Sequence, residues 1–424
     1  MASLQVKSLS SIPAGTRTWR SLRRGLAHTV ACKATYQLDA GEAQLAPDQE
    51  LLSPVDAHWN DDPRKSLRRA SDWAPFKRRA DVVLVGSAFA PGSTQVRRLV
   101  VCLAVGPMEK AFEVRCDRSV GMDDVVQEGP PFARMPLVWE RAGGGADTNN
   151  PAGRAPVRDP FGKIQLPNLQ PLAFDPAPPE WEVAPVGFGP IAPSWPTRLH
   201  GLGAHAKTGV DALLESGLPD DFDYSYFQVA PRDQQLDRFH TDSQILLENL
   251  VAGTERLVTR LPGHRARAVL EPTGREIELV PDTIWIDTDH QLLTITWRGT
   301  VWVADHPTAS RVLIAVEPRD AQFTPEQIRE LGQGGEETMS LSLPEEPSTI
   351  GLPFASGRGA EARGMHDSYV GTPFGPGATP PPQAVASNPA FSTPLRSFET
   401  AELPAISDEM STSDLIREHI GAVT

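Results

Sequence analysis

Proline is concentrated in two parts of this 424-residue chain. Of its 41 prolines, 12 lie in residues 143–196 and another 12 in residues 321–424. Proline has no amide hydrogen to donate to a neighbouring strand, so neither part can supply a central strand of a sheet. We therefore expect loops, linkers or a tail in these two parts and regular secondary structure in the rest of the chain.

The rest of the chain carries the pattern of β-strands. In residues 112–117 apolar and charged side chains alternate, which is the period of a half-buried strand. The apolar run before this segment ends at Gly106-Pro107, and the two segments together predict a hairpin over 97–117. By the same signals we expect strands at 27–38, 81–92, 275–280 and 311–316, and a second hairpin over 282–299.

Helical signals are short and few. Residues 209–216 have helical character, and Thr324, Pro325 and Gln327 form a capping box that begins another helix. Short strands joined by short turns, without helical crossovers, indicate antiparallel pairing. The sequence thus predicts a mainly β fold of antiparallel sheets, sandwich- or barrel-like, with long Pro/Gly-rich ordered loops, few short helices and a disordered C-terminal tail.

Composition divides the chain into segments. Residues 1–26 contain four arginines and no acidic residue, which resembles a targeting peptide, but they lack an apolar core and we expect a flexible arm. The segments that follow are a β-rich domain at 27–320 (sub-halves 27–142 and 197–320, joined by the excursion 143–196), a short helix at 321–332, a disordered acidic tail rich in Pro, Gly and Ser at 333–412, and a short C-terminal helix at 413–421.

Aromatic residues recur through the proline-rich excursion. They are Phe161, Phe174, Trp181, Phe188 and Trp195. Large apolar side chains at intervals along a loop favour its attachment to a core. We therefore expect the excursion to be ordered and packed on the domain.

The net charge of −14 is unevenly spread. Residues 321–424 hold 14 acidic residues and 5 arginines, whereas the other 320 residues hold 40 acidic and 35 basic residues. A protein that binds nucleic acid needs a basic face, so this balance argues against one. No apolar run reaches the roughly 18 residues of a membrane span, and we expect no membrane insertion. The sparse cysteines Cys32, Cys102 and Cys116 indicate buried thiols in a reducing compartment, hence a cytoplasmic protein.

Catalytic and cofactor motifs are incomplete. Two GxGxxA strings, at 187–192 and 201–206, do not follow apolar strands and do not predict a dinucleotide site. Asp287, Asp289 and His290 could hold a metal, but these residue types are also typical of a polar hairpin turn. We expect no cofactor and no metal.

Two charged pairs have two interpretations each. Asp72 with Lys77, or Glu140 with Arg141, could act as catalytic pairs or could be ion pairs that fix loops. A nucleophile, a base and an orienting group cannot be assembled around either pair. The sequence therefore favours a protein without enzymatic activity.

Residues 222–235, FDYSYFQVAPRDQQ, combine four aromatic residues with Gln234 and Gln235. In one interpretation the aromatic side chains belong to the core and the glutamines satisfy backbone groups of a nearby loop. In the other they form a peptide-binding groove, because aromatic rings give contact area and amides pair with an extended backbone. The residues alone leave both open.

Several segments together resemble a large bacterial family of domains of unknown function that lies beside type VI secretion genes and is described as an effector adaptor or chaperone. They run in family order across about residues 29–318: 71–92, 116–118, 130–145, 149–153, 165–170, 186–198, 221–236, 261–263 and 282–299. The chain departs from the family pattern at 201–214, where the family usually has a Gly-Thr-Tyr-like segment and a Trp. This segment is a candidate for client specificity.

The resemblance implies a non-enzymatic adaptor that helps to load a toxin onto a secretion spike. Its partner would be a PAAR-type spike-tip protein or the effector itself. One alternative is a structural component of a contractile injection particle. Another is a hydrolase with a site around Asp72, Lys77, Glu140 and Arg141.

Partner-binding residues are expected on the domain and on the tail. Those on the domain are Trp195, Arg198, Tyr224, Tyr226, Phe227, Gln234 and Gln235. Those on the tail are Phe354, Phe374, Leu415, Ile416 and Ile420, which belong to two similar short segments and to the C-terminal helix.

The tail prediction is tested by truncation. Removal of residues 321–424 is expected to leave the fold intact and to weaken partner binding, as measured by thermal unfolding and by pull-down. Unfolding of the truncated domain would instead show that this part of the chain belongs to the core.

Overall fold

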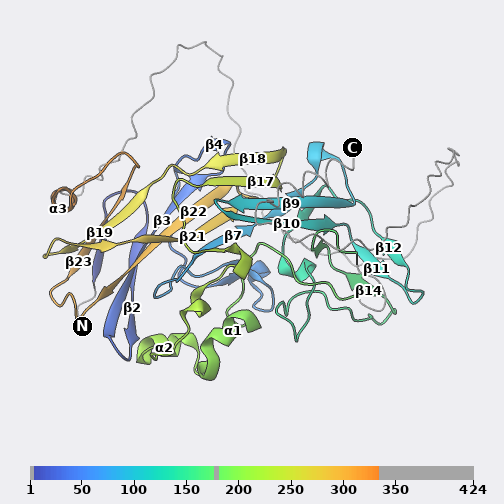
Figure 1. The fold of residues 1–424 in the computed structure, drawn as a ribbon, viewed down its shortest axis with the longest axis horizontal. Coiled ribbons are helices and arrows are strands. Elements are labelled where there is room, and N and C mark those ends of the chain that lie inside the picture. Colours follow the sequence, from blue (N-terminus) through green and yellow to red (C-terminus); the bar gives the residue numbers. More distant parts are fainter. Residues whose placement is uncertain (1–3, 176–180, 334–424) are drawn as a thin grey trace, which may run out of the picture. The chain divides into compact units, whose positions relative to one another are not determined.

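The computed structural model describes residues 4–175 and 181–333, and these residues form the mainly β fold that the sequence predicts (Figure 1). A first sheet has the strand order β16 (Gln235–Leu236), β7 (Ala80–Val85), β21 (Val280–Asp287), β22 (Leu292–Trp302), β3 (Gly25–Gln37), β2 (Ala14–Ser21). In this sheet β7 and β21 run parallel and the other neighbours run antiparallel.

Two further sheets complete the main β structure. The second has the order β15 (Leu169–Gln170), β10 (Met108–Arg115), β9 (Arg98–Val105), β17 (Gln244–Val251), β18 (Thr254–Arg260), β4 (Gly41–Glu42). The third has the order β1 (Gln5–Ser8), β23 (Arg311–Glu317), β19 (Arg265–Glu271), β20 (Arg275–Glu278). Only their outer strands β4 and β1 pair in parallel, with β18 and β23.

Smaller elements lie around these sheets. The small sheets are β12 (Val126–Glu128), β11 (Arg118–Val120), β14 (Ile164–Leu166); β13 (Arg134–Pro136), β8 (Ser87–Phe89); and β5 (Ala57–His58), β6 (Leu67–Arg69). The α-helices are α1 (Pro196–Leu202), α2 (Val210–Ser216) and α3 (Pro325–Gln333). The 3-10 turns are η1 (Trp59–Asp61), η2 (Pro91–Ser93), η3 (Trp139–Arg141), η4 (Gly203–His205), η5 (Tyr224–Phe227) and η6 (Arg232–Gln234).

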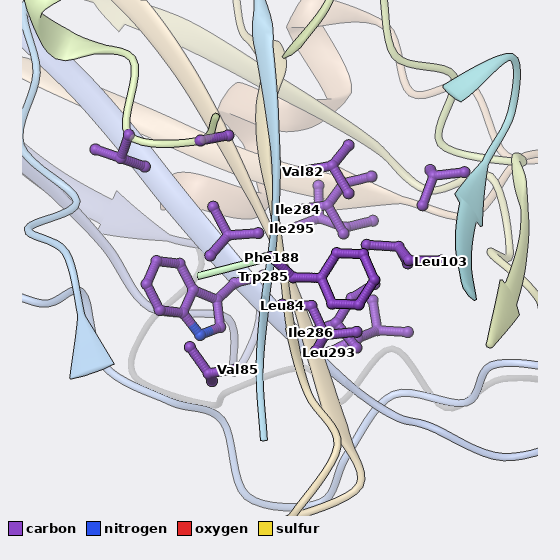
Figure 2. Close-up of a cluster of buried hydrophobic side chains, with 14 of the residues drawn as sticks. Val82, Leu84, Val85, Leu103, Phe188, Ile284, Trp285, Ile286, Leu293 and Ile295 are labelled. Atoms are coloured by element: carbon purple, nitrogen blue, oxygen red, sulfur yellow. The ribbon is translucent and has the colours of Figure 1, made fainter. Parts of the chain in front are cut away.

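One face of the first sheet is apolar and forms the main core. Figure 2 shows side chains of this core, which joins β7, β21 and β22 with Leu103 of the second sheet and Phe188 of the excursion. Residues two apart along a strand share a face, so Val82 and Leu84 both point into this core. Burial of such side chains contributes about 1.5–3 kcal/mol each to stability.

The opposite face of the same sheet, which we call the polar face, is also buried and carries a row of polar side chains beside the apolar Val83, Val85 and Trp285. Asp81, Thr283, Thr296 and Lys33 are paired in register across four strands, and each is less than a tenth exposed. Segment 49–77 covers this face through polar contacts, such as those from Thr29 Oγ1 to the carbonyl oxygens of residues 74 and 75. The sheet is therefore covered on both faces, by apolar packing on one and by hydrogen bonds together with contacts to Trp285 on the other.

Both predicted hairpins are confirmed. In the β9–β10 hairpin Val105 pairs with Met108, and in the β21–β22 hairpin Asp287 pairs with Leu292. The predicted helix at 209–216 is α2, and the capping box of α3 forms, because the Thr324 amide donates to Gln327 Oε1 and the Gln327 amide donates to Thr324 Oγ1. The helix α1 was not predicted, although Pro196 at its first position is a helix-start signal.

The expectation of a flexible arm at 1–26 is wrong for the residues that the structure describes. Residues 5–8 form β1, and residues 14–21 form β2, which pairs with β3 along its whole length. Trp19 of β2 is buried, with its ring centroid 5.1 Å from that of Trp302. Pairing with distant strands and burial of this indole outweigh the arginine-rich composition of the segment.

The proposed division into sub-halves 27–142 and 197–320 is also not what the structure shows. In the first sheet β3 pairs with β22 and β7 pairs with β21, and in the second sheet β9 pairs with β17. Strands from the two parts therefore pair with each other within the first and second sheets and share one core. Non-local pairing of this kind has no signature in a local sequence pattern.

The segment after residue 320 begins as part of this body. Ile328 of α3 is fully buried against Val269, Leu313 and Ala315. A truncation that tests the tail should therefore end at residue 333, because a cut at 320 removes a core side chain. The tail beyond residue 333 and the helix expected at 413–421 lie outside the described residues.

The excursion is packed on the body, as expected, but through only some of its aromatic residues. Trp181, Phe188 and Trp195 are buried, whereas Phe161 and Phe174 are exposed. A close backbone approach also holds it, since a Cβ at Gly143 would lie 1.8 Å from the carbonyl oxygen of Val183. Only glycine fits at position 143, because any side chain there would overlap the carbonyl oxygen of Val183.

The cysteines are free and buried, as predicted. Burial raises the pKa of the Cys32 thiol and that of the Cys102 thiol to about 12. Both thiols are therefore protonated at neutral pH and are poor nucleophiles.

His264 is a buried titratable group in the core. Its Nδ1 is hydrogen bonded to Tyr36 Oη at 2.8 Å, and burial lowers the pKa of the imidazole to about 4. The folded protein thus holds this ring neutral at pH values where the unfolded chain binds a proton. The sign follows from proton linkage: stability is full above about pH 6.5 and falls as the pH drops toward 4.

Acid destabilisation tests this assignment. Between pH 7.5 and pH 4 the His264 contribution to the free energy of unfolding should fall by about 3 kcal/mol, the equivalent of the pKa difference. His264→Gln, which keeps a hydrogen-bonding side chain without the titration, should show a smaller loss in urea unfolding over this pH range. Equal losses in the two proteins would contradict the assignment.

Candidate protein-binding surfaces

The aromatic residues of segment 222–227 form a second core. Phe222, Tyr226 and Phe227 are buried together with side chains of α1, α2 and β2. Tyr224 is half-buried and its ring stacks on Phe76 with a centroid distance of 4.1 Å. The predicted peptide groove is therefore not built from these rings, and the interpretation as core residues is the one that the structure shows.

The other predicted binding residues of the domain satisfy backbone groups. Gln234 Nε2 donates to the carbonyl oxygens of Val82 and Phe188, and Gln235 Nε2 donates to that of Ala230. The buried Arg198 guanidinium donates to the carbonyl oxygens of Ile191 and Tyr226. These side chains tie the excursion and segment 226–235 to the first sheet.

A buried carboxylate organises the same region. Asp81 on β7 is fully buried and accepts hydrogen bonds from Lys77 Nζ at 2.6 Å, Gln228 Nε2 at 2.9 Å, and the amides of Val229 at 2.9 Å and Ala230 at 3.2 Å. The ammonium neutralises the charge and the three N–H donors fill the remaining lone pairs. The contact fixes segment 228–230 against the sheet.

The charged pairs suggested for catalysis do not form. Lys77 binds Asp81, whereas Asp72 binds Lys33 at 2.9 Å. Glu140 accepts bonds from the backbone amide and the hydroxyl of Ser66, and Arg141 donates to Asn168 Oδ1. The ion pairs of the other interpretation, Asp72 with Lys77 and Glu140 with Arg141, do not form either, and each of the four residues is bound to a different partner.

The candidate metal residues form a polar turn. His290 Nδ1 lies 2.9 Å from Asp287 Oδ2, while Asp289 binds Arg134 at 2.8 Å. Within residues 4–175 and 181–333 no group of three or more metal-binding side chains gathers.

A groove lies where the excursion meets α1 and η6. Its volume is about 540 Å³, and its lining comprises Trp139, Asn149, Pro185, Ile191, Pro196, Thr197, His200, Pro231 and Arg232. These residues were not predicted from the sequence, although the predicted Trp195 and Arg198 flank two of them. The lining is drawn from distant segments, so no local pattern could have identified it.

A second surface collects exposed apolar side chains. Among the described residues, five of the ten exposed large hydrophobic side chains lie in two short segments, 122–126 and 157–161. They are Met122, Val125, Val126, Val157 and Phe161, which we call the apolar lobe. Phe161 is 85% exposed and Met122 is 75% exposed. The concentration in one place distinguishes the lobe from scattered surface residues.

Arg158 joins the two segments of the apolar lobe. Its guanidinium donates to the carbonyl oxygens of Gly121 and Gly162 and pairs with Asp124 at 2.8 Å. A Cβ at Gly162 would lie 2.8 Å from Met122 Sδ, so the two segments are in contact. Strand β12, which begins at Val126, forms one edge of its small sheet.

The tail residues suggested for partner binding, Phe354, Phe374, Leu415, Ile416 and Ile420, lie outside the described residues.

The described part of the chain contains no helix long and apolar enough to cross a membrane.

Comparison with known proteins identifies a family. The family model described as "Uncharacterized protein conserved in bacteria (DUF2169)" matches residues 24–298. No curated protein and no solved structure matches the chain. The match includes both surfaces and the Asp81 contact.

The Asp81 contact is testable with a double-mutant cycle. Asp81→Asn leaves a buried ammonium unpaired and should lower the free energy of unfolding by about 3 kcal/mol. The double variant with Lys77→Met removes both charges and should be less destabilised than the sum of the two single variants.

A matched exposed pair gives the control. Asp237 binds Arg79 at the surface, and Asp237→Asn should change the free energy of unfolding by less than about 1 kcal/mol. Additive effects in the Lys77–Asp81 cycle, measured by urea unfolding, would contradict the role given to this pair.

Proposed function

The chain belongs to the DUF2169 family, and we propose that it is a non-enzymatic adaptor or chaperone that binds a partner protein. The observation that carries this proposal is the apolar lobe, where half of the exposed large hydrophobic side chains of the described residues meet on two contacting segments. Contiguous exposed apolar surface is typical of protein-binding sites.

The geometry of the apolar lobe favours a protein partner. The side chains of the lobe are exposed, between 40% and 85%, and an exposed apolar surface suits a complementary protein surface better than a small molecule, which binds in a cavity. The adjacent edge strand β12 offers unpaired backbone groups that an extended segment of a partner could join. The side chains of the lobe would then make apolar contacts with the partner, and pairing with β12 would fix the orientation of the partner's segment.

The finer proposal is a role in type VI secretion. On the resemblance described above, the protein acts in the cytoplasm and loads an effector, or the PAAR-type spike-tip protein that carries it, onto the secretion spike. The support is the order and content of the matching segments. If the protein is instead a structural component of a contractile injection particle, it would use the same surface but would stay bound to its partner permanently. No observation among the described residues favours the hydrolase.

Substitution of the apolar lobe tests the binding function. The double variant Met122→Ser with Phe161→Ser should weaken partner binding by at least about tenfold, because two apolar contacts are lost. Its stability should change by less than about 1 kcal/mol, because both side chains are exposed. Binding is measured between the purified protein and a candidate spike-tip or effector protein.

The matched control and the cellular test complete the design. Leu51→Ser removes a similarly exposed apolar side chain outside the lobe and should leave binding unchanged. Failure to recover any spike or effector component with the tagged protein, together with unchanged effector export in a deletion strain, would refute the secretion role. Stoichiometric presence in purified particles would favour the structural alternative.

A further inference from the structure

The groove joins segments that are far apart in the sequence. Trp139 comes from η3, Asn149 from the loop after it, Ile191 from the excursion, Thr197 from the first turn of α1, and Arg232 from η6. Four of the segments that carry the family resemblance, 130–145, 149–153, 186–198 and 221–236, thus meet at one surface. This surface is separate from the apolar lobe.

The walls of the groove are held rigid without a ligand. The Trp139 indole donates to the carbonyl oxygen of Pro190 at 3.2 Å and meets Trp195 edge to face at 5.9 Å. The amide of Ile191 donates to the carbonyl oxygen of Val229 at 2.7 Å. Prolines at 185, 196 and 231 have fixed φ angles. Because the walls are already ordered, little conformational entropy would be lost when a ligand binds.

The basic side chains in the groove favour a ligand with negative charge. Its lining contains the basic side chains of His200 and Arg232 and no carboxylate. Nearby carboxylates have other hydrogen-bonding partners: Asp233 pairs with Lys110 at 2.9 Å, and Asp223 accepts from Ser225 and meets Arg232 only through longer-range charge attraction. Among the described residues the Arg232 guanidinium makes no hydrogen bond or ion pair, and the residue is exposed. A carboxylate on the ligand would complement it.

The apolar lining favours a ligand whose backbone is extended. An aromatic ring beside proline and isoleucine side chains resembles the surfaces that take proline-containing extended segments, which are already extended before they bind. Asn149 and Thr197 add polar groups that can pair with an extended backbone. A volume of about 540 Å³ is within the range of ligand sites.

We propose that this groove binds an extended, proline-containing acidic segment of a partner protein, with a ligand carboxylate on Arg232. The inference rests on the proposed binding function and specifies a second contact, distinct from the apolar lobe. The occupant it names is a peptide segment of another protein, recognised by charge and by apolar contact together.

Selection of peptides by the full-length protein tests the proposal. A random-peptide display library is panned against the protein, and a variant with the groove filled, Thr197→Trp, serves for subtraction. Enriched peptides should contain proline and at least one acidic residue. No enrichment over the filled variant, or enrichment of basic peptides, would overturn the proposal.

Charge reversal then locates the carboxylate contact. A fluorescein-labelled selected peptide should bind Arg232→Glu at least about tenfold more weakly than the wild type, as one charge-assisted hydrogen bond predicts. Replacing the acidic residue of the peptide by lysine should restore binding to Arg232→Glu. The control Arg23→Glu makes the same charge change at an exposed turn position and should bind like the wild type.

The remaining outcomes are also decisive. Equal binding by Arg232→Glu and the wild type would reject the assigned contact. A change of oligomeric state in Arg232→Glu, measured by light scattering, would show that a second copy of this chain occupies the groove instead. The apolar lobe variant should bind the selected peptide normally, so failure of the lobe proposal and failure of this one are distinguishable.

Discussion

The buried carboxylate of Asp81 is the contact on which the arrangement of the binding region depends. It lies on the polar face of the first sheet, and its partners include the ammonium of Lys77 and the backbone of residues 229 and 230. Segment 226–235 holds the walls of the groove through Pro231 and Arg232. An ionised group inside a protein is stable only when it is neutralised and fully hydrogen bonded, so the position of this segment is narrowly defined.

The same principle extends across the polar face. Lys33 binds Asp72, and Arg298 binds both Asp282 and the carbonyl oxygen of Asp72. Burial lowers the pKa of the Lys33 ammonium, and the charge of Asp72 opposes that effect. Segment 49–77 is therefore held by directional polar contacts. Apolar packing tolerates small shifts of register, whereas such contacts do not.

Local patterns were enough to predict part of this fold. The alternation in residues 112–117 and the turn after β21 placed both hairpins, since period and turn chemistry act over a few residues. The strand character of residues 14–21 was missed, because their burial depends on pairing with β3 and on contact between Trp19 and Trp302. The aromatic residues of 222–227 could be assigned to core or surface only once the helices beside them were known. The groove was not predictable, because its lining is assembled from segments up to 93 residues apart, from Trp139 to Arg232.

The pairing of early strands with late strands has a consequence for synthesis. β3 is complete at residue 37, but its partner β22 ends at residue 302, so most of the domain must leave the ribosome before the first sheet can close. Folding that depends on such distant pairings is slow and leaves strand edges exposed in the meantime. During synthesis the apolar residues of β3 therefore wait for their partners in β22 until almost the whole domain has been made.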